Sequence, residues 1–250
     1  MVAAGRCPLG GLAAQMSAGQ AWAARPLAAL RAAAEAGDLA AMEVLGERFR
    51  FGVRGAPHDD AQAVIWWRRS AAGNVAIAQY NLGVMHENDL GGLVQNHAEA
   101  ARLYRLAADA GYANAQFGLA NFFFHGRGVR EDKAEAVRLL KLAAAQGHAG
   151  AQGNLASAYR SGRDVAVDFA AALLVARRAA DGGNAVGAYH AGQIYEFGQG
   201  VPVDKREAVK WYAKGAEEGQ GECIECLRAL AAEGVAEASA ALRRLRIAPA

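Results

Sequence analysis

The chain of 250 residues is 53% hydrophobic and 21% charged, and its formal net charge of +2 is too small to indicate nucleic-acid or anionic-membrane binding. Three cysteines cannot form a repeating disulfide framework, so we expect packing to stabilise the fold. No run approaches the roughly eighteen uninterrupted apolar residues of a membrane span, so we expect no transmembrane helix.

The first 25 residues are rich in alanine and glycine and contain no acidic side chain. Their apolar run from Leu9 to Ala14 is too short for a secretory signal, so residues 1–25 are expected to form a flexible or loosely helical leader. An organelle-targeting segment is the alternative, although Ser17 is the only serine there. A cytoplasmic location is favoured.

A glycine then recurs at nearly constant spacing. The recurring glycines are Gly37, Gly73, Gly111, Gly147, Gly183 and Gly219, at intervals of 36, 38, 36, 36 and 36 residues. A fixed period of this length is typical of a solenoid, in which stacked units share one core. The 38-residue interval predicts that the first unit closes one residue early. It also predicts an irregular second unit, with Asp89 and Gly91–Gly92 in its loop.

Each unit is predicted to hold two helices. In the unit after Gly111, the first helix places Ala115, Leu119, Ala120 and Phe123 on one face. The third of these positions is always glycine or alanine, which lets a neighbouring helix approach closely. The first helix is expected to end at a glycine that adopts a left-handed conformation. These glycines are Gly52, Gly126, Gly162 and Gly198, and Asp89 stands at that point in the second unit.

The second helix of each unit is expected to begin at an Asp or Asn N-cap. The N-caps are Asp59, Asn96, Asp132, Asp168 and Asp204. Three residues later stand Gln62, Glu99, Glu135 and Glu207, which predicts a capping box in four of the five units.

The two ends of the array are atypical. Residues 26–36 are predicted to form a lone second helix, and residues 222–247 a degenerate first helix followed by a capping helix. We therefore predict an all-α fold, with a solenoid over residues 26–247. Its five helix-turn-helix repeats are placed at about 38–73, 74–111, 112–147, 148–183 and 184–219.

The fifth repeat shows the shared pattern most fully, with Gly198-Gln-Gly-Val201, Asp204, Ala208-Val-Lys-Trp211-Tyr212 and Gly219. This pattern resembles the Sel-1-like repeat, a relative of the tetratricopeptide repeat with a slightly longer unit. It departs from the family in using alanine for the small glycine in repeats three and four, and His86 for tyrosine. The resemblance implies a right-handed superhelix whose first helices line a concave groove. It also implies a non-catalytic scaffold or adaptor that binds a protein or peptide segment there.

By analogy with peptide-binding tetratricopeptide repeats, certain positions of each first helix are expected to face the groove. They are Glu43, Glu47, Arg50, Tyr80, Asn81, Glu87, Phe117, Asn121, Phe124, His125, Asn154, Arg160, Tyr189, His190, Gln193 and Glu196. Amides can bond a peptide backbone and rings can cover its side chains. The alternative is that some of these rings only pack on the next repeat. Because Phe122, Phe123 and Phe124 cannot all point inward, at least one ring should meet the groove or a partner.

A ligand-binding protein or enzyme that uses the same groove, with His125, His190 or Glu87, is the alternative function. We expect no catalytic residue, metal or cofactor, because the six histidines fall at no ligand spacing. Cys223 and Cys226 form a lone CxxC, so we expect packing rather than a redox or zinc site.

Four basic residues, Arg68, Arg105, Lys141 and Arg177, occupy one equivalent position near the end of the second helix. A basic ladder for nucleic acid is one interpretation. Complementing the helix dipole is favoured, since interleaved aromatic partners for these cations are missing from the sequence pattern. We expect a protein partner, no nucleic acid, no membrane association and a monomer.

Overall fold

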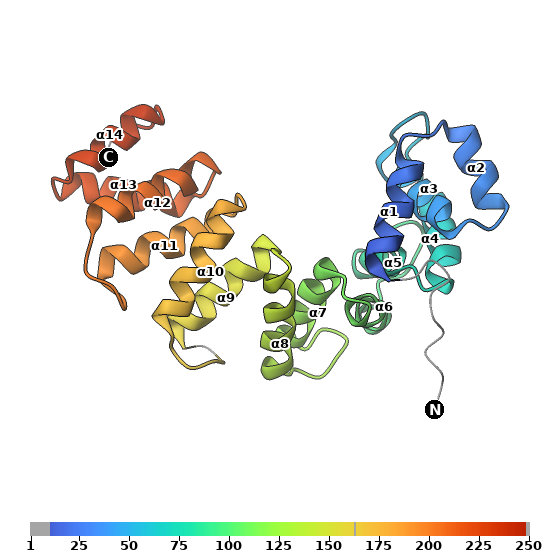
Figure 1. Cartoon of the computed structure of the whole chain (residues 1–250), viewed down its shortest axis with the longest axis horizontal. Helices are drawn as coiled ribbons and strands as arrows, with labels where there is room; N and C mark the ends of the chain where they lie inside the picture. The colour runs from blue at the N-terminus through green and yellow to red at the C-terminus, as the bar shows by residue number, and fades with distance from the viewer. Residues whose placement is uncertain (1–10, 163, 249–250) are drawn as a thin grey trace. The chain divides into compact units, whose positions relative to one another are not determined.

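The computed structural model describes residues 11–162 and 164–248, which form fourteen α-helices and no strand (Figure 1). Among these helices, none combines the length and the apolar character needed to cross a membrane. The helices are α1 (Leu12–Ala23), α2 (Leu27–Glu35), α3 (Leu39–Phe51), α4 (Asp60–Ala72), α5 (Ala76–Glu87), α6 (His97–Asp109), α7 (Ala113–His125), α8 (Lys133–Ala145), α9 (Ala149–Ser161), α10 (Phe169–Asp181), α11 (Ala185–Phe197), α12 (Lys205–Glu217), α13 (Gly221–Ala232) and α14 (Ala236–Arg244).

The chain divides into two compact units, one ending at Asp132 and the other beginning at Lys133. The first holds α1–α7 and the second α8–α14, coloured blue to green and green to red in Figure 1. In the first unit, α2 to α6 each pack on the next helix in the chain, around a core that includes Leu45, Trp67 and Leu82. In the second, α8 to α14 show the same order of packing. The predicted all-α solenoid of helix pairs is confirmed, while the right-handed superhelix and the continuous groove stay predictions.

The left-handed ends of the first helices are confirmed. Gly52, Gly126, Gly162 and Gly198 have φ of 61°, 61°, 69° and 64°, and Asp89 takes the same conformation with φ of 56°. Asp tolerates this region better than most residues because its short polar side chain can bond locally.

The predicted early closure of the first repeat is wrong. The left-handed residue that ends its second helix is Asn74, with φ of 61°, whereas Gly73 has φ of −85°. Asparagine can serve at this position in place of glycine. Repeats one and two are therefore equally long, and each carries one extra residue in its loop, from Gly52 to Asp59 and from Asp89 to Asn96.

The N-caps are confirmed in four repeats. In a capping box the cap's own backbone N–H would bond the side chain three residues on, whereas here this N–H bonds the first helix. The side chains of Asp59, Asn96, Asp168 and Asp204 accept from the backbone N–H three residues on, at 2.8–3.0 Å. Their own backbone N–H groups donate to the carbonyls of Phe49, His86, Tyr159 and Tyr195 at 2.8–3.0 Å. Each cap thus ties the start of a second helix to the aromatic position of the first helix before it.

Residues 12–23, expected within a flexible or loosely helical leader, form the regular helix α1, and α1 packs on α3. The buried Gln15 side chain accepts from the N–H of Ala76 at 2.9 Å, at the start of α5, where Val75 offers no side-chain cap. Trp22 Nε1 donates to Asp38 at 3.1 Å. Polar bonds at both ends therefore hold a helix that has few apolar anchors. Residues 1–10 of the expected leader, with Cys7, lie outside the described residues.

Arg48 on α3 completes the docking of α1. Its guanidinium is only 2% exposed and donates to the carbonyls of Trp22, Ala23 and Arg25, at 3.3, 3.0 and 2.6 Å. These carbonyls lie at the C-terminal end of α1, where a helix has unpaired acceptors and a partial negative charge. Arg48 thus caps α1 from the neighbouring helix.

Candidate functional site

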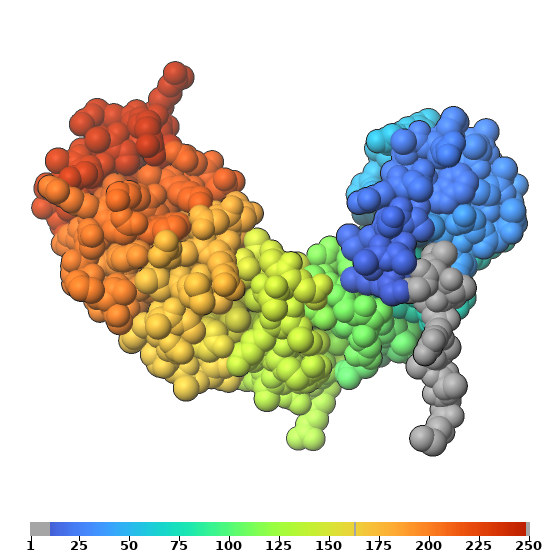
Figure 2. Space-filling model, viewed as in Figure 1, coloured from blue at the N-terminus to red at the C-terminus, as the bar shows by residue number. Residues whose placement is uncertain are grey.

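A hollow of about 330 Å³ opens on the first unit, between α1 and the first helices of repeats one and two. Its lining residues are Met16, Gly19, Gln20 and Ala23 from α1, Glu43, Val44, Glu47 and Phe51 from α3, Ile77 and Asn81 from α5, and Tyr112 just before α7. We call it the first-unit hollow. The dark blue α1 lies at the surface of this unit in Figure 2. Of the predicted groove residues, Glu43, Glu47 and Asn81 come together here, whereas Tyr112 and the wall formed by α1 were missed.

Glu43 is a buried carboxyl in this hollow. It stands one helical turn before Glu47, so the two side chains share a face of α3. Glu43 is 6% exposed and Glu47 is exposed. Burial, and to a lesser extent the negative charge of Glu47, raises the pKa of Glu43 to about 8. No residue in the described part of the chain donates a hydrogen bond to the Glu43 carboxyl, so its polar atoms face the hollow without a partner.

A cluster of tyrosines lies beside the hollow. The ring of Tyr80 is 5.4 Å from that of Tyr104 and 5.3 Å from that of Tyr112, between centroids. Tyr104 donates its hydroxyl to Glu87 at 2.6 Å, and Arg127 pairs with Glu87 at 3.2 Å. Tyr80 and Glu87, both predicted to face a partner, are therefore engaged with neighbouring side chains. Burial raises the pKa of Tyr112 to about 12, which keeps its phenol neutral at the edge of the hollow.

The other candidates of the first unit lie elsewhere. Arg50 forms an ion pair with Asp60 at 3.0 Å, at the start of α4. Phe122 and Phe123 are buried, and Phe124 is the half-buried ring of the three. Phe117 and Asn121 are also half-buried, and the exposed His125 has its Nδ1 2.8 Å from the Asn121 carbonyl oxygen.

In the second unit, three adjacent candidates on α11 form a local cluster. Gln193 donates to the Tyr189 hydroxyl at 2.8 Å, and the Tyr189 and His190 rings are 5.5 Å apart. His190 is only 7% exposed, and burial followed by the charge of Arg160 lowers its pKa to about 4. Glu196 accepts from the Tyr212 hydroxyl at 2.5 Å. Asn154 is exposed and Arg160 half-buried on α9.

Three of the four predicted basic positions of the second helices, Arg105, Lys141 and Arg177, do have aromatic partners, contrary to the expectation from the sequence, and so does Arg31 at the equivalent position of α2. Arg31, Arg105 and Lys141 lie over the rings of Phe49, Phe123 and Tyr159, at 5.8, 5.1 and 5.7 Å from the centroids. Each ring belongs to the next repeat, eighteen residues further along the chain. Arg177 lies over Trp211 instead, at 5.8 Å. These contacts connect neighbouring repeats, and a basic residue followed eighteen positions later by an aromatic one would have revealed them in three of these cases.

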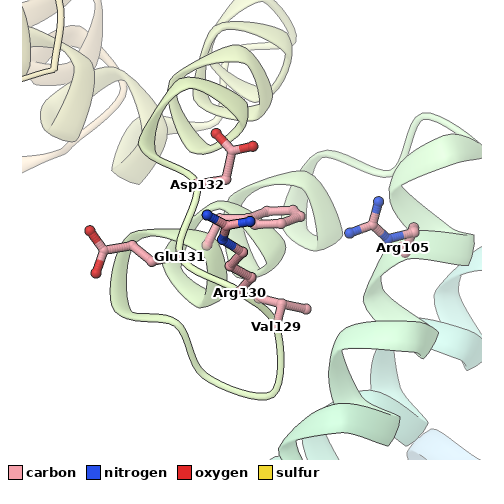
Figure 3. A pocket seen from close by; sticks show the side chains of 6 residues that line it. Arg105, Val129, Arg130, Glu131 and Asp132 are labelled. Atoms are coloured by element: carbon pink, nitrogen blue, oxygen red, sulfur yellow. The ribbon is translucent and has the colours of Figure 1, made fainter.

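A second hollow, of about 510 Å³, adjoins the loop of the third repeat. It is lined by Arg105, Phe123 and the loop residues Val129, Arg130, Glu131 and Asp132. Figure 3 shows Arg105 and Arg130 on different segments, with Glu131 directed away from both. Two arginines and two acids give this lining no net charge, so it favours no charged ligand.

The two C-terminal cysteines are free thiols. Cys223 is fully buried, and burial raises its pKa to about 12, which disfavours the reactive thiolate. Within the described residues, no group of three or more His, Cys, Asp and Glu side chains could hold a metal ion.

The comparison with protein families decides the identity of the fold. The family model of the Sel1 repeat matches residues 39–75, 76–112, 113–148, 149–184 and 185–220. The chain belongs to the Sel1 repeat family. The first two matched Sel1 repeats are one residue longer than the other three, in agreement with Asn74 as the end of the first. Sel1 repeats generally mediate protein–protein interactions and are typically non-catalytic.

Solved structures support the same assignment. The chain is 26% identical to a Sel1 repeat protein from Oxalobacter formigenes, with a TM-score of 0.69 over 78% of this chain and 75% of that one. It is also 26% identical to a protective antigen of uropathogenic Escherichia coli with an SLR fold, with a TM-score of 0.73 over 96% of this chain. The match spans 58% of that antigen.

A more distant structure shares the fold alone. An immunity protein from Pseudomonas aeruginosa is 20% identical, with a TM-score of 0.53 over 85% of this chain and 82% of that one. No curated protein sequence matches the chain significantly.

Proposed function

We propose that this Sel1 repeat protein is a non-catalytic scaffold or adaptor that binds a peptide segment of a protein partner on the surface of its first helices. The observation that carries the proposal is the first-unit hollow. There, α3 and α5 present carboxyl and amide groups beside an aromatic wall, and no side chain of the unit fills the space.

The lining has the chemistry that peptide recognition requires. Asn81 is half-buried and can donate to and accept from a peptide backbone. Phe51 is 63% exposed and lines the hollow, so its ring can contact an apolar side chain of a peptide. A concave, mostly apolar surface with a few polar groups is the usual form of a binding site.

The partner is inferred to be a protein rather than a nucleic acid, and the protein is inferred to be a monomer. The net charge is close to zero, and Arg105, Lys141 and Arg177 of the basic ladder lie over rings of other repeats. Light scattering on the purified chain tests the oligomeric state.

The residues that an enzymatic alternative would use do not favour it. The Glu87 carboxylate is engaged by Tyr104 and Arg127. His190 is buried with its pKa lowered to about 4, which makes it a weak base at neutral pH.

Site-specific crosslinking tests the proposal. A photoreactive side chain is placed at Asn81 or Asn121 on first helices, and, as matched controls, at the exposed Ile65 and Leu142 on second helices. In extract from the native cell, we expect one polypeptide partner to crosslink to the first-helix positions and not to the controls. Equal crosslinking at Ile65 and Leu142, or turnover of a small substrate by the pure chain, would overturn the proposal.

A further inference from the structure

We propose that the first-unit hollow binds a basic side chain of the partner, preferably an arginine, between Glu43 and Glu47. This inference rests on the proposed function and names the chemistry that the first repeat would recognise.

Glu43 breaks the pattern of the repeats. Its position on the first helix is held by Tyr80, Phe117 and Tyr189 in repeats two, three and five. Those repeats place a ring where repeat one places a carboxyl that is 6% exposed. Burying a carboxyl without a hydrogen-bond partner destabilises a fold. A residue of this kind is expected where a ligand supplies the missing partner.

The surroundings provide no counter-charge. The hollow-lining residues of α1 and α5 are uncharged. The titratable groups that face Glu43 are Glu47 on its own helix and the phenol of Tyr112 from the segment before α7. Burial and the negative charge of Glu47 disfavour a negative charge at Glu43, so the carboxyl is held in its neutral form until a cation enters.

The shape and lining suit a guanidinium group. Glu43 and Glu47 lie one turn apart and can accept from the two edges of a planar fork, and the side-chain oxygen of Asn81 can accept a further bond. Tyr112 and Phe51 offer ring faces for stacking. Val44 and Ile77 offer apolar surface to the methylene stem. A volume of about 330 Å³ lies at the small end of the roughly 300–1,000 Å³ of ligand sites.

Other ligand classes fit less well. Glu47 repels an anion. A hard divalent cation takes about six oxygen ligands, mostly carboxylates and carbonyls, and this hollow has two carboxylates with no third acidic or histidine ligand nearby.

Binding of a cation should release a proton. The pKa of Glu43 is about 8, so at a pH below this value Glu43 must lose its proton to pair with the guanidinium. The affinity should therefore rise close to tenfold per pH unit between pH 6 and pH 7 and level off above pH 8.

The experiment uses the full chain labelled with ¹⁵N and titrated with three acetylated, amidated tripeptides. Their central residues are arginine, lysine and citrulline, the last being the neutral analogue of arginine. We expect amide shifts around the hollow, at Gly46 and Asn81, with the arginine peptide binding at least tenfold more tightly than the citrulline peptide. Glu43→Gln and Glu47→Gln should each weaken arginine binding at least tenfold, and the exposed Glu218→Gln should not. Glu43→Gln mimics the neutral acid and should fold normally, which its amide spectrum checks.

Equal binding of the arginine and citrulline peptides, or an affinity that does not change with pH, would overturn the inference. Tighter binding of free spermidine than of the arginine peptide would reassign the hollow to a small polyamine. If a partner crosslinks at Asn81 and Asn121 but needs no basic residue, this inference fails while the proposed scaffold function stands. If the arginine peptide binds but no partner crosslinks, the site stands and the proposed function fails.

Discussion

Gly46 lies directly against the indole of Trp67: a Cβ atom at residue 46 would stand 2.6 Å from Trp67 Nε1. The indole N–H donates to the Glu43 carbonyl at 3.1 Å, which fixes the ring across the glycine. The second repeat has the same relationship, with a Cβ at Gly83 only 2.8 Å from the Tyr104 ring. In the fourth repeat alanine replaces the glycine, and the second helix has Ala176 at the position of Trp67 and Tyr104, in one core cluster with Ala156. Glycine at this position thus accompanies a large ring on the second helix.

Gly46→Ala is expected to destabilise the protein by about 1–3 kcal/mol, because the new methyl group overlaps the indole in a close-packed core. This loss should outweigh the roughly 1 kcal/mol by which alanine favours a helix interior. The measurement is urea denaturation followed by tryptophan fluorescence. Gly118→Ala is the matched control, because its Cβ would meet Tyr104 at an ordinary 3.5 Å, and it should be neutral or stabilising. Equal destabilisation of both variants would contradict the explanation.

Arg48→Met should release α1 from the first unit. The variant keeps the apolar stem but removes the donors to Trp22, Ala23 and Arg25. Leaving these carbonyls without partners should cost about 1–3 kcal/mol of stability. Hydrogen exchange of residues 12–23 should become at least tenfold faster, while exchange in α12 stays unchanged. The exposed Arg68→Met serves as the control. Unchanged protection of α1 would show that Arg48 does not hold it.

The first unit should become less stable as the pH rises from about 4.5 to 8. Burial raises the pKa of Glu43 to about 8, so the unfolded chain loses this proton at a lower pH than the folded chain. The stability linked to Glu43 is fully present below pH 4.5 and falls by about 3 kcal/mol by pH 7. Glu43→Gln should abolish this slope in denaturation curves measured between pH 5 and pH 8. A slope that persists in the variant would assign the effect to another group.

The second unit should respond in the opposite direction at lower pH. The pKa of His190 is lowered to about 4, so the unfolded chain takes up a proton that the folded chain excludes. Stability is present above the ordinary pKa of about 6.5 and is lost as the pH falls toward 4, by about 3 kcal/mol. The fluorescence of Trp211, the tryptophan of this unit, reports the loss. His190→Gln should flatten the dependence, and the exposed His125→Gln should leave it as in the parent chain. A steep loss in both variants would point away from His190.

The candidate site was only partly predictable. Counting along the first helices placed Glu47 and Asn81 on the face that lines the first-unit hollow, because side-chain direction follows the helical period. The same count proposed Arg50, Glu87 and His190. In the structure Arg50 pairs with Asp60, Glu87 accepts from Tyr104, and His190 is buried on α11. Which residues on a face remain available depends on neighbours that lie far away in the chain.

The repeats themselves were determined by the sequence alone. The glycines after the first helices and the Asp and Asn caps answer local requirements of the backbone, and local requirements recur wherever the residues recur. Tertiary structure decided the rest. Asn74, and not Gly73, ends the first repeat in the left-handed conformation, and α1 docks because its own Gln15 bonds Ala76 at one end and Arg48 of α3 bonds its carbonyls at the other. The burial of Glu43 belongs to the same class: its place on α3 follows from the sequence, but its burial follows only from helices that pack around it.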